Sequence, residues 1–423
     1  MHQRTWLSIL TFPVLAAFTC PVVFESAQDV PKVEIWNMNR DPAVGISDVK
    51  EAFTLIDSTY VDKPDMEKVI KGGIQYVLSE THPMNSYLTI GDLRLSDPGP
   101  ASVGIAVIKK YMYASIISVV PGSPAARFGL KVGDNIRKLN NESVGSMSSW
   151  TLERRLRGPV GSDLDLLVFG HGPNNEELRK ITLKRELIKA PPITTFCDSR
   201  ANVVVLTDLN LGRASELKAI LEGLNHGIPL ILDIRQCAGG CLTEAASVAG
   251  IFVDAGPLAT IQEVGKPPVA LSVMPANIRT FTNVAVIQGG YTIGASEALS
   301  SALKRQFIPV FGSCTYGLGL ERTRFLLKHG GAAEIVNKYW LGASGELLGS
   351  YGKKTDDPGS AMLKDDLGVP IRFPDHYGVL PNYVIEADNS KDSWLPKVLE
   401  VIESRHKCSA VSLPITGKLT FNN

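Results

Sequence analysis

The strongest constraint on the fold is an alternation of strand-like and helix-like segments in the second half of this 423-residue chain. Apolar runs of strand length occur at residues 203–206, 229–234 and 284–287, and helical patterns follow them at 214–224, 244–252 and 296–303. Strands that are joined by helical crossovers lie parallel to one another in one sheet. The pattern therefore predicts a mixed α/β domain with a substantially parallel sheet.

An earlier region has the pattern of a smaller, β-rich domain. Its short strand-like and helical runs are at residues 103–108, 114–120, 150–156 and 164–169. Between them, residues 121–126 read Pro-Gly-Ser-Pro-Ala-Ala, and residues 129–136 read Gly-Leu-Lys-Val-Gly-Asp-Asn-Ile. The glycines turn the backbone, and Pro124 starts a short helical turn. This series closely resembles a PDZ domain.

The resemblance to a PDZ domain implies a peptide-binding site. PDZ domains bind an extended peptide as an additional strand and hold its terminal carboxylate on backbone amides. By resemblance, the carboxylate loop consists of Ser102, Val103, Gly104 and Ile105, and Gly104 leaves the amides open to a ligand. We expect protein C-termini or unfolded segments as ligands. A PDZ domain that packs only within its own protein is the alternative.

The N-terminal region reads as a targeting signal. Arg4 precedes a mostly apolar run at residues 6–24, which Pro13 and Pro21 interrupt. A basic start and a short apolar core are typical of a secretory signal, and Ala27 is a possible cleavage point. We therefore predict export to the periplasm or the extracellular space. A membrane anchor retained at the N-terminus is the alternative.

Charge and cysteine patterns narrow the classes of function. Lysine plus arginine and aspartate plus glutamate both total 43, and no basic stripe suggests a nucleic-acid partner. Cys237 and Cys241 have a spacing that could suit a metal or a strained disulfide, but no nearby histidine completes a ligand set. We favour two small residues beside a tight turn, and we expect neither a metal nor a cofactor.

Three further motifs resemble one known family. Residues 81–88 (Thr-His-Pro-Met-Asn-Ser-Tyr-Leu) resemble an Asp-Pro-His-Ser-Ser-Tyr-Leu signature. Residues 232–240 resemble Leu-Asp-Leu-Arg-Asn-Asn-Pro-Gly-Gly, and residues 377–382 resemble a Gly-Val-x-Pro-Asp segment. Together with the PDZ-like region, they follow the order found in carboxyl-terminal processing peptidases, or tail-specific proteases. The resemblance covers residues 49–385.

This resemblance implies a multidomain α+β and α/β architecture, with a helical N-terminal segment, a PDZ domain and a Clp-protease/crotonase-like peptidase domain. Helical spacing at residues 46–80, with a break at Pro64, agrees with the first of these. The predicted boundaries are 1–27 for the signal peptide, 28–97 for the helical segment, 98–188 for the PDZ domain and 189–423 for the peptidase-like domain.

The catalytic residues that the family implies are missing from their motifs. These peptidases use a serine nucleophile and a lysine general base, because a hydroxyl attacks only after a neighbouring base takes its proton. The nucleophile position, three residues before Glu297, holds Gly294. The base position holds Leu318, and the supporting glutamine corresponds to Arg322. Loss of the nucleophile alone costs on the order of a million-fold in turnover in a serine protease. We therefore expect negligible hydrolysis.

A displaced nucleophile is the alternative. Ser296 matches a later, non-catalytic serine of the motif, and we expect it to cap a helix. Cys314 has intrinsic nucleophilicity, but its neighbours predict a place inside a strand. Gly239 and Gly240 are the candidates for amides that stabilise an oxyanion.

The sequence therefore favours an exported pseudoenzyme of the serine peptidase family that binds protein tails through its PDZ domain. An active endopeptidase that uses Ser296 or Cys314 is one alternative. A structural partner of an active paralogue, or of a second copy, is another, with the helical segment before Leu88 as the contact surface.

Overall fold

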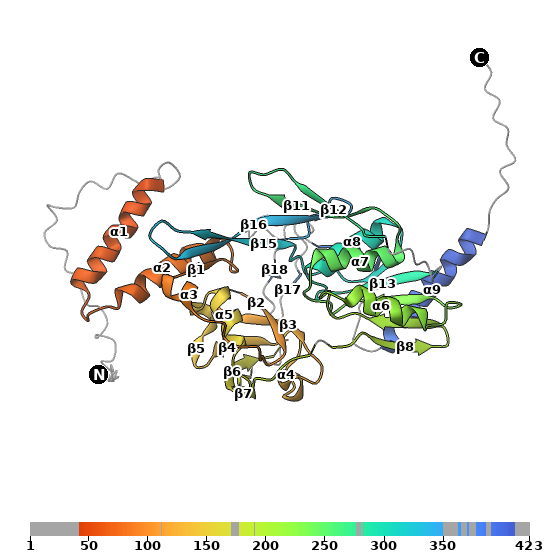
Figure 1. The fold of residues 1–423 in the computed structure, drawn as a ribbon, viewed down its shortest axis with the longest axis horizontal. Helices are drawn as coiled ribbons and strands as arrows, with labels where there is room; N and C mark the ends of the chain where they lie inside the picture. Colours follow the sequence, from red (N-terminus) through yellow and green to blue (C-terminus); the bar gives the residue numbers. More distant parts are fainter. Residues whose placement is uncertain are drawn as a thin grey trace, which may run out of the picture. The chain divides into compact units, whose positions relative to one another are not determined.

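The computed structural model describes residues 42–410, apart from 111, 171–176, 190, 276–280, 282, 350–362, 365–369, 372–377 and 386–390 (Figure 1). The predicted signal peptide lies outside the described residues. The chain divides into two compact units, residues 1–66 and 67–423. In the described part of the chain, no helix is long and apolar enough to cross a membrane.

The region before the PDZ domain is helical, as the spacing of apolar residues predicted. Helix α1 spans Pro42–Thr59 in the first unit, and α2 spans Met66–Thr81 after the break at Pro64. Strand β1 (Ser86–Leu88) and helix α3 (Ile90–Arg94) follow. Thr89 caps α3, because its hydroxyl accepts a hydrogen bond from the Asp92 amide at 3.0 Å.

The PDZ region is a sheet with strand order β2-β3-β4-β6-β7, in which β5 also pairs with β4. The strands are β2 (Ile105–Lys109), β3 (Ala114–Val119), β4 (Asn135–Leu139), β5 (Glu142–Ser143), β6 (Asp163–Phe169) and β7 (Arg179–Lys184). The helices are α4 (Pro124–Arg127), the 3₁₀ turn η1 (Val144–Ser146) and α5 (Ser149–Leu156). Leu152 of α5 packs into the same core as Ile116 and Leu164 of the sheet. Strand β2 ends the sheet, so one of its edges has no partner strand among the described residues.

The second half contains the predicted parallel sheet, with strand order β19-β14-β13-β10-β9-β8. Its strands are β8 (Thr194–Asp198), β9 (Ala201–Val205), β10 (Leu230–Asp233), β13 (Val284–Gln288), β14 (Val310–Gly312) and β19 (Tyr383–Val384). All neighbours are parallel except β8, which is antiparallel to β9. The apolar runs were predictable because strands covered on both faces are apolar throughout.

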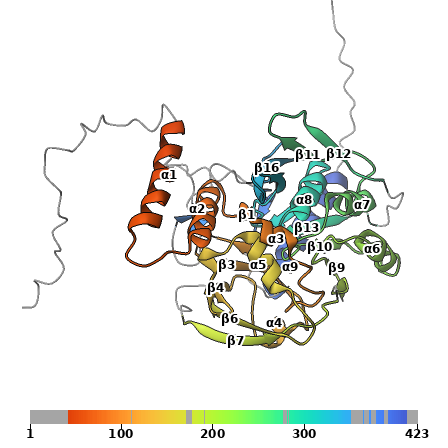
Figure 2. The same ribbon diagram turned by 60° about the vertical axis from the view of Figure 1, so that its left-hand side comes forward.

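Helices cover both faces of this sheet (Figures 1 and 2). They are α6 (Arg213–Glu222), α7 (Leu242–Phe252), α8 (Ala295–Arg305) and α9 (Lys391–Ala410). One apolar cluster joins α6, α7 and α8 to residues such as Leu232 and Val286 of the sheet. A second cluster joins α9, through the fully buried Trp394, to Ile231 and Phe311. The fold class predicted from the sequence is confirmed.

An antiparallel sheet that the sequence did not predict completes the second unit. Its strand order is β1-β16-β11-β12, and β15 also pairs with β16. The strands after β1 are β11 (Pro257–Glu263), β12 (Val269–Ser272), β15 (Leu320–Leu326) and β16 (Ala332–Gly342). A separate two-stranded pair consists of β17 (Leu363–Lys364) and β18 (Pro370–Ile371). Because β1 pairs with β16, residues that precede the PDZ region are part of a sheet formed mainly by the second half of the chain.

Candidate active site

The loops that follow β10, β13 and β14 converge at the carboxyl ends of these parallel strands, where α/β sheets bind their ligands. Ala238, after β10, forms a bridge with Ile293, after β13. The Tyr316 amide, after β14, donates a hydrogen bond to the Thr292 carbonyl at 3.1 Å. The structure therefore brings together the three segments that carry Gly239 and Gly240, Gly294 and Leu318.

Gly294 has the backbone of a nucleophile but no side chain. It lies immediately before α8 with φ 72° and ψ −119°. Hydrolase nucleophiles commonly occupy a strained turn between a strand and a helix, where a positive φ exposes the side chain. A Cβ atom at this position would meet no heavy atom within 4 Å. The turn and the space for a serine are therefore both present.

Glu297 ties this turn to the segment that carries the base position. Its carboxylate is fully buried and accepts hydrogen bonds from the amides of Gly294 (2.8 Å), Gly317 (2.7 Å) and Leu318 (2.9 Å). It also accepts one from the Thr315 hydroxyl at 2.7 Å. Burial raises the pKa of Glu297 to about 7, although these four hydrogen bonds favour the charged form. The sequence placed Glu297 in the motif but gave no sign of this bracing role.

Leu318 offers no basic group to the site. Its side chain is half-buried and packs with Ile293 against Ile108 and Ile117 of the PDZ region. A cation of the PDZ region contacts the same turn, because Nζ of Lys110 lies 2.9 Å from the Tyr316 hydroxyl. The sequence did not single out Lys110, because 206 residues separate it from Tyr316.

Arg322 takes part in an interdomain contact. Its Nη2 lies 3.0 Å from Oε1 of Glu153 on α5, and its Nη1 donates to the Met84 carbonyl at 3.3 Å. Glu334 on β16 lies further away, at 3.8 Å. A guanidinium remains protonated at ordinary pH, so Arg322 cannot act as the base.

Ser296 does not cap α8, so that expectation was wrong. It is the second residue of the helix, which begins directly after Gly294. Its fully buried hydroxyl donates to the Cys237 carbonyl at 2.7 Å and accepts from the Ile293 amide at 2.9 Å. Glu297 instead accepts the amide hydrogen at the start of the helix. The recorded partners of the Ser296 hydroxyl are backbone groups and the Cys237 thiol, whose pKa is raised mainly by burial, so none of them acts as a base at neutral pH.

Cys314 lies two residues beyond the end of β14, so the prediction that it lies inside a strand was wrong. Burial is the main reason why the pKa of its thiol is raised to about 11, and the nearby Glu297 carboxylate adds to the effect. A thiol with this pKa is almost entirely protonated at neutral pH, and the thiolate is the nucleophilic form. This electrostatic setting disfavours nucleophilic attack by Cys314.

The loop with Gly239 and Gly240 is exposed beside these segments. Both glycines have positive φ, 87° and 94°. A Cβ atom on Gly240 would lie 2.1 Å from the Leu209 carbonyl oxygen, so only glycine fits there. Cys237 and Cys241, which flank this loop, form no disulfide. Among the described residues, no cluster of histidine, cysteine, aspartate and glutamate could hold a metal.

The proposed carboxylate loop of the PDZ region is partly occupied by its own contacts. The Ser102 amide donates to the Glu186 carbonyl at 2.9 Å, and the Gly104 amide donates to the Ser102 hydroxyl at 3.0 Å. The Gly104 carbonyl accepts from Val120, next to β3. Because a trans peptide points its C=O and N–H in opposite directions, the Ile105 amide points away from β3, toward the open edge.

Gly104 is required by packing as well. It has φ 80°, and a Cβ atom there would lie 2.2 Å from Cβ of Ser123, the residue that caps α4. The resemblance to PDZ domains explains this glycine by ligand access alone, and the structure adds a packing reason. A bulky substitution would distort the start of α4, so loss of peptide binding in such a variant would not identify the ligand site.

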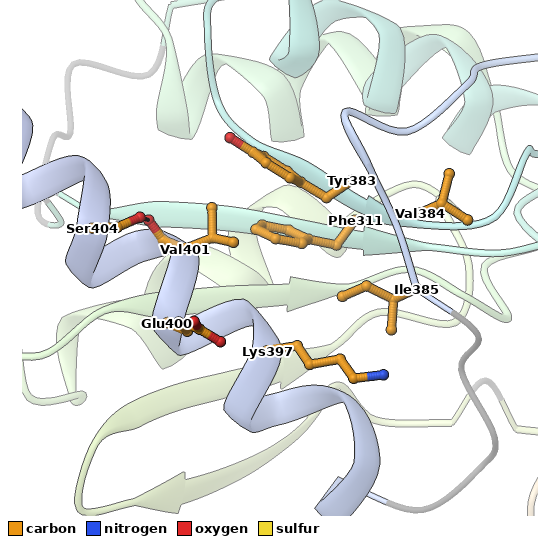
Figure 3. Close-up of a pocket in the computed structure, with 8 residues that line it drawn as sticks. All are labelled: Phe311, Tyr383, Val384, Ile385, Lys397, Glu400, Val401 and Ser404. Carbon is orange, nitrogen blue, oxygen red and sulfur yellow. Dashed lines mark hydrogen bonds between the residues drawn. The ribbon is translucent and has the colours of Figure 1, made fainter.

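A shallow surface groove of about 330 Å³ lies elsewhere, between β14, β19 and α9 (Figure 3). Tyr383 and Phe311 stack in its floor with ring centroids 4.8 Å apart. None of the residues at the catalytic positions of the family lines this groove.

Comparisons with known proteins agree with this arrangement. A model of peptidase family S41 matches residues 200–357, and a PDZ domain model matches residues 115–168. A probable CtpA-like serine protease of Staphylococcus aureus (strain MSSA476) is 25% identical over 368 residues, which are 84% of this chain and 73% of the relative. The carboxy-terminal processing protease CtpA of Bacillus subtilis (strain 168) is 26% identical over 398 residues, 88% of this chain and 84% of the relative.

The fold has a counterpart among solved structures. The photosystem II D1 C-terminal processing protease matches with a TM-score of 0.60 and 21% identity, over 81% of this chain and 94% of that protein. In this chain, the PDZ match at residues 115–168 precedes the peptidase match at residues 200–357. The chain therefore contains a peptidase domain of family S41 after a PDZ domain, and as a whole it is similar to the carboxyl-terminal processing peptidases.

Proposed function

We propose that this chain is a catalytically inactive member of its family, which binds protein C-termini or extended segments through its PDZ domain without cutting them. The observation that carries the proposal is that Gly294 stands at the position of the nucleophile. It occupies the strained turn where the nucleophile belongs, with open space in place of a hydroxyl. Leu318 stands at the base position and packs against isoleucines.

Neither a nucleophile nor a base that could deprotonate it is present at the positions that the family uses. A peptidase needs a hydroxyl or thiol that a nearby base can deprotonate. Ser296 is buried with backbone groups and the protonated Cys237 thiol as partners, and burial raises the pKa of Cys314 to about 11. Any amides near Gly239 and Gly240 would then stabilise an oxyanion that nothing generates.

The peptide-binding part of the proposal rests on the edge of β2. This strand has an open side, α5 contacts it, and the Ile105 amide points outward. An extended peptide that adds to such an edge gains main-chain hydrogen bonds, and its carboxylate gains an amide at the end of the strand. The internal partners of Ser102 and Gly104 leave fewer amides for this carboxylate than the sequence suggested.

One experiment tests both peptide binding and the absence of cleavage, because the bound peptide is analysed after incubation. The protein beginning at residue 28 is screened against decapeptides with free carboxyl termini, and the best peptide is synthesised again with an amidated terminus. We expect the amide to bind at least about tenfold more weakly, because it loses the charge-assisted hydrogen bonds of the carboxylate. Mass spectrometry after prolonged incubation should recover the free-carboxylate peptide intact.

Three outcomes would count against the proposal. If no peptide binds, the PDZ domain serves packing within the protein. If the amidated and free peptides bind equally, the ligand is recognised by its side chains or main chain alone. If the peptide is cut, the chain is an active peptidase.

Export is part of the same proposal. The basic start and short apolar run at residues 4–24 support it. Fractionation of cells that express the full chain should find the protein outside the cytoplasm, shortened at its N-terminus. Full-length protein in the cytoplasmic fraction would contradict this part.

A further inference from the structure

We propose that residues 315–322, the segment that carries the base and its supporting glutamine in active relatives, serve in this chain as a docking surface that fixes the PDZ domain against the peptidase domain. Two of the three altered catalytic positions, Leu318 and Arg322, lie in this segment and contact the PDZ region. The partner of the surface is the chain's own PDZ domain. The inference does not depend on whether any substrate is cut.

The centre of this docking surface is apolar. Ile108 of β2 and Ile117 of β3 form a separate cluster with Ile293, and Leu318 and Tyr316 pack against it. Neither Ile108 nor Ile117 belongs to the core of the PDZ domain. They are nevertheless only 8% and 7% exposed, because the peptidase domain covers them. A PDZ domain that moved away would expose this pair to water at an energetic cost.

A polar contact lies beside the apolar centre. The Lys110 ammonium donates to the Tyr316 hydroxyl at 2.9 Å and lies 5.2 Å from the centre of the Tyr316 ring. An ammonium over an aromatic face is attracted by the electron density of the ring. Tyr316 belongs to the same turn as Leu318, so both residues contact the strand pair β2–β3 from one short stretch of chain.

Arg322 makes a third contact, to α5. Its guanidinium bridges Glu153 on α5 and the Met84 carbonyl before β1. The N-terminus of α5 is held from the same side, since the Ser149 hydroxyl donates to the Pro83 carbonyl at 3.0 Å. Helix α5 is thereby attached both to the segment before β1 and to β15.

The residues found in active relatives would not make these contacts. A lysine at position 318 would place an ammonium among isoleucines, where burial disfavours the charged form. A glutamine at position 322 would lose the charge attraction to Glu153. The substitutions that remove the catalytic groups therefore also create the contacts that hold the PDZ domain.

Hydroxyl-radical footprinting of the whole protein, read by mass spectrometry, tests this inference because it reports solvent exposure of individual side chains. In the wild type we expect slow oxidation of Ile108 and Ile117. Leu318→Lys and Arg322→Gln should each speed oxidation of these residues by about threefold or more, since each promotes opening of the contact. The matched controls are Leu326→Lys, at a side chain that is 79% exposed at the end of β15, and Arg324→Gln, whose partner is Glu334.

A double-variant comparison isolates the ion pair and covers the case in which Leu318→Lys does not fold. Glu153→Gln should raise the oxidation rate as Arg322→Gln does, and the double variant should rise no further than either single variant. Circular dichroism checks that each variant is folded. Unchanged oxidation in folded Leu318→Lys and Arg322→Gln would overturn the inference, as would an equal rise in the Leu326→Lys or Arg324→Gln controls.

Discussion

At the scale of the residue, two positions of the candidate site hold glycine for different structural reasons. Gly294 has a positive φ but open space around its missing Cβ, so only the backbone strain opposes a side chain. Gly240 has a positive φ and a carbonyl oxygen 2.1 Å from where its Cβ would lie. The first position can regain a serine at moderate cost, whereas the second cannot take one without moving Leu209.

These two glycines give a matched pair of variants. We expect Gly294→Ser to lower the free energy of unfolding by roughly 1–3 kcal/mol, the cost of a strained backbone conformation. Gly240→Ser should cost more, or prevent folding, because strain and overlap add. Urea unfolding followed by circular dichroism measures both. A tolerated Gly240→Ser beside an unfolded Gly294→Ser would show that the two positions have been misread.

His82, in the motif before β1, links stability to pH. Burial, followed by the nearby charges of Lys110 and Arg322, lowers its pKa from 6.5 to about 4. Between these values the unfolded chain binds a proton that the folded chain does not bind, so stability falls as pH drops from about 6.5 toward 4. By pH 5 the loss from this residue should be roughly 1–2 kcal/mol relative to pH 7.

His82→Asn is the variant that tests this, because its side-chain oxygen can replace Nδ1 as the acceptor for the Met84 amide. Urea unfolding at pH 7 and pH 5 should show a smaller loss on acidification in the variant than in the wild type. An identical loss in both proteins would assign the pH dependence to other groups.

At the scale of the element, one carboxylate joins the start of α8 to the connection between β14 and β15. Glu297 accepts two hydrogen bonds on each carboxylate oxygen, from donors in both segments. All four partners are donors, and three of them are backbone amides, which can only donate a hydrogen bond. The shape of the candidate active site thus depends on an acidic residue that is not at a catalytic position of the family.

Replacement of Glu297 by glutamine should be costly. The glutamine offers one acceptor oxygen instead of two, so two buried donors lose their partner and face an NH₂ group. We expect a loss of roughly 2–4 kcal/mol in the free energy of unfolding, since a buried donor without a partner costs about 1–3 kcal/mol. Glu222→Gln, at an exposed position of α6, is the control. Equal stability of the two variants, measured by urea unfolding, would contradict the bracing role.

The elements that the sequence predicted are those with local signals. Strands β9, β10 and β13 are apolar because both faces are covered, and the PDZ turns are marked by their glycines and Pro124. The strand β16 was not predicted, because half-buried residues run through its middle without a period of two. Its position depends on pairing with β1, β11 and β15, which lie far apart in the sequence.

For the candidate site too, the sequence predicted the features that have local motifs and missed the long-range contacts. Motif spacing placed Gly239, Gly294 and Leu318 in one site, and the structure brings their segments together. The role of Ser296 was misjudged, because Glu297 and a glycine turn take over the start of α8. The contact of Arg322 with Glu153 spans 169 residues, and no local pattern could have shown it.

At the scale of the whole molecule, residues 315–322 contact the PDZ region, so introducing the catalytic residues of the family there should also loosen the two domains. We expect the variant with Gly294→Ser, Leu318→Lys and Arg322→Gln to hydrolyse casein slowly, far below the level of an active relative. The new lysine has apolar neighbours that lower its pKa, which a base requires. A fluorescent casein assay gives the rate.

The matched control for this variant replaces Gly294 by alanine and keeps the other two substitutions. It shares the backbone strain and the loosened domains but has no hydroxyl, so it should show no hydrolysis above background. Equal hydrolysis by the serine and alanine versions would mean that the activity comes from another group or from a contaminant.

The central claim is that the protein as it exists has no working nucleophile, and the rate of peptide hydrolysis by the wild type tests this most directly. The purified wild type, Ser296→Ala and Cys314→Ala are compared on one fluorogenic peptide with a free C-terminus. We predict that all three give the rate of buffer alone. The Ser296 hydroxyl donates its hydrogen bond to a backbone carbonyl instead of a base, and the Cys314 thiol is protonated at neutral pH. Hydrolysis by the wild type that disappears in either alanine variant would contradict the account.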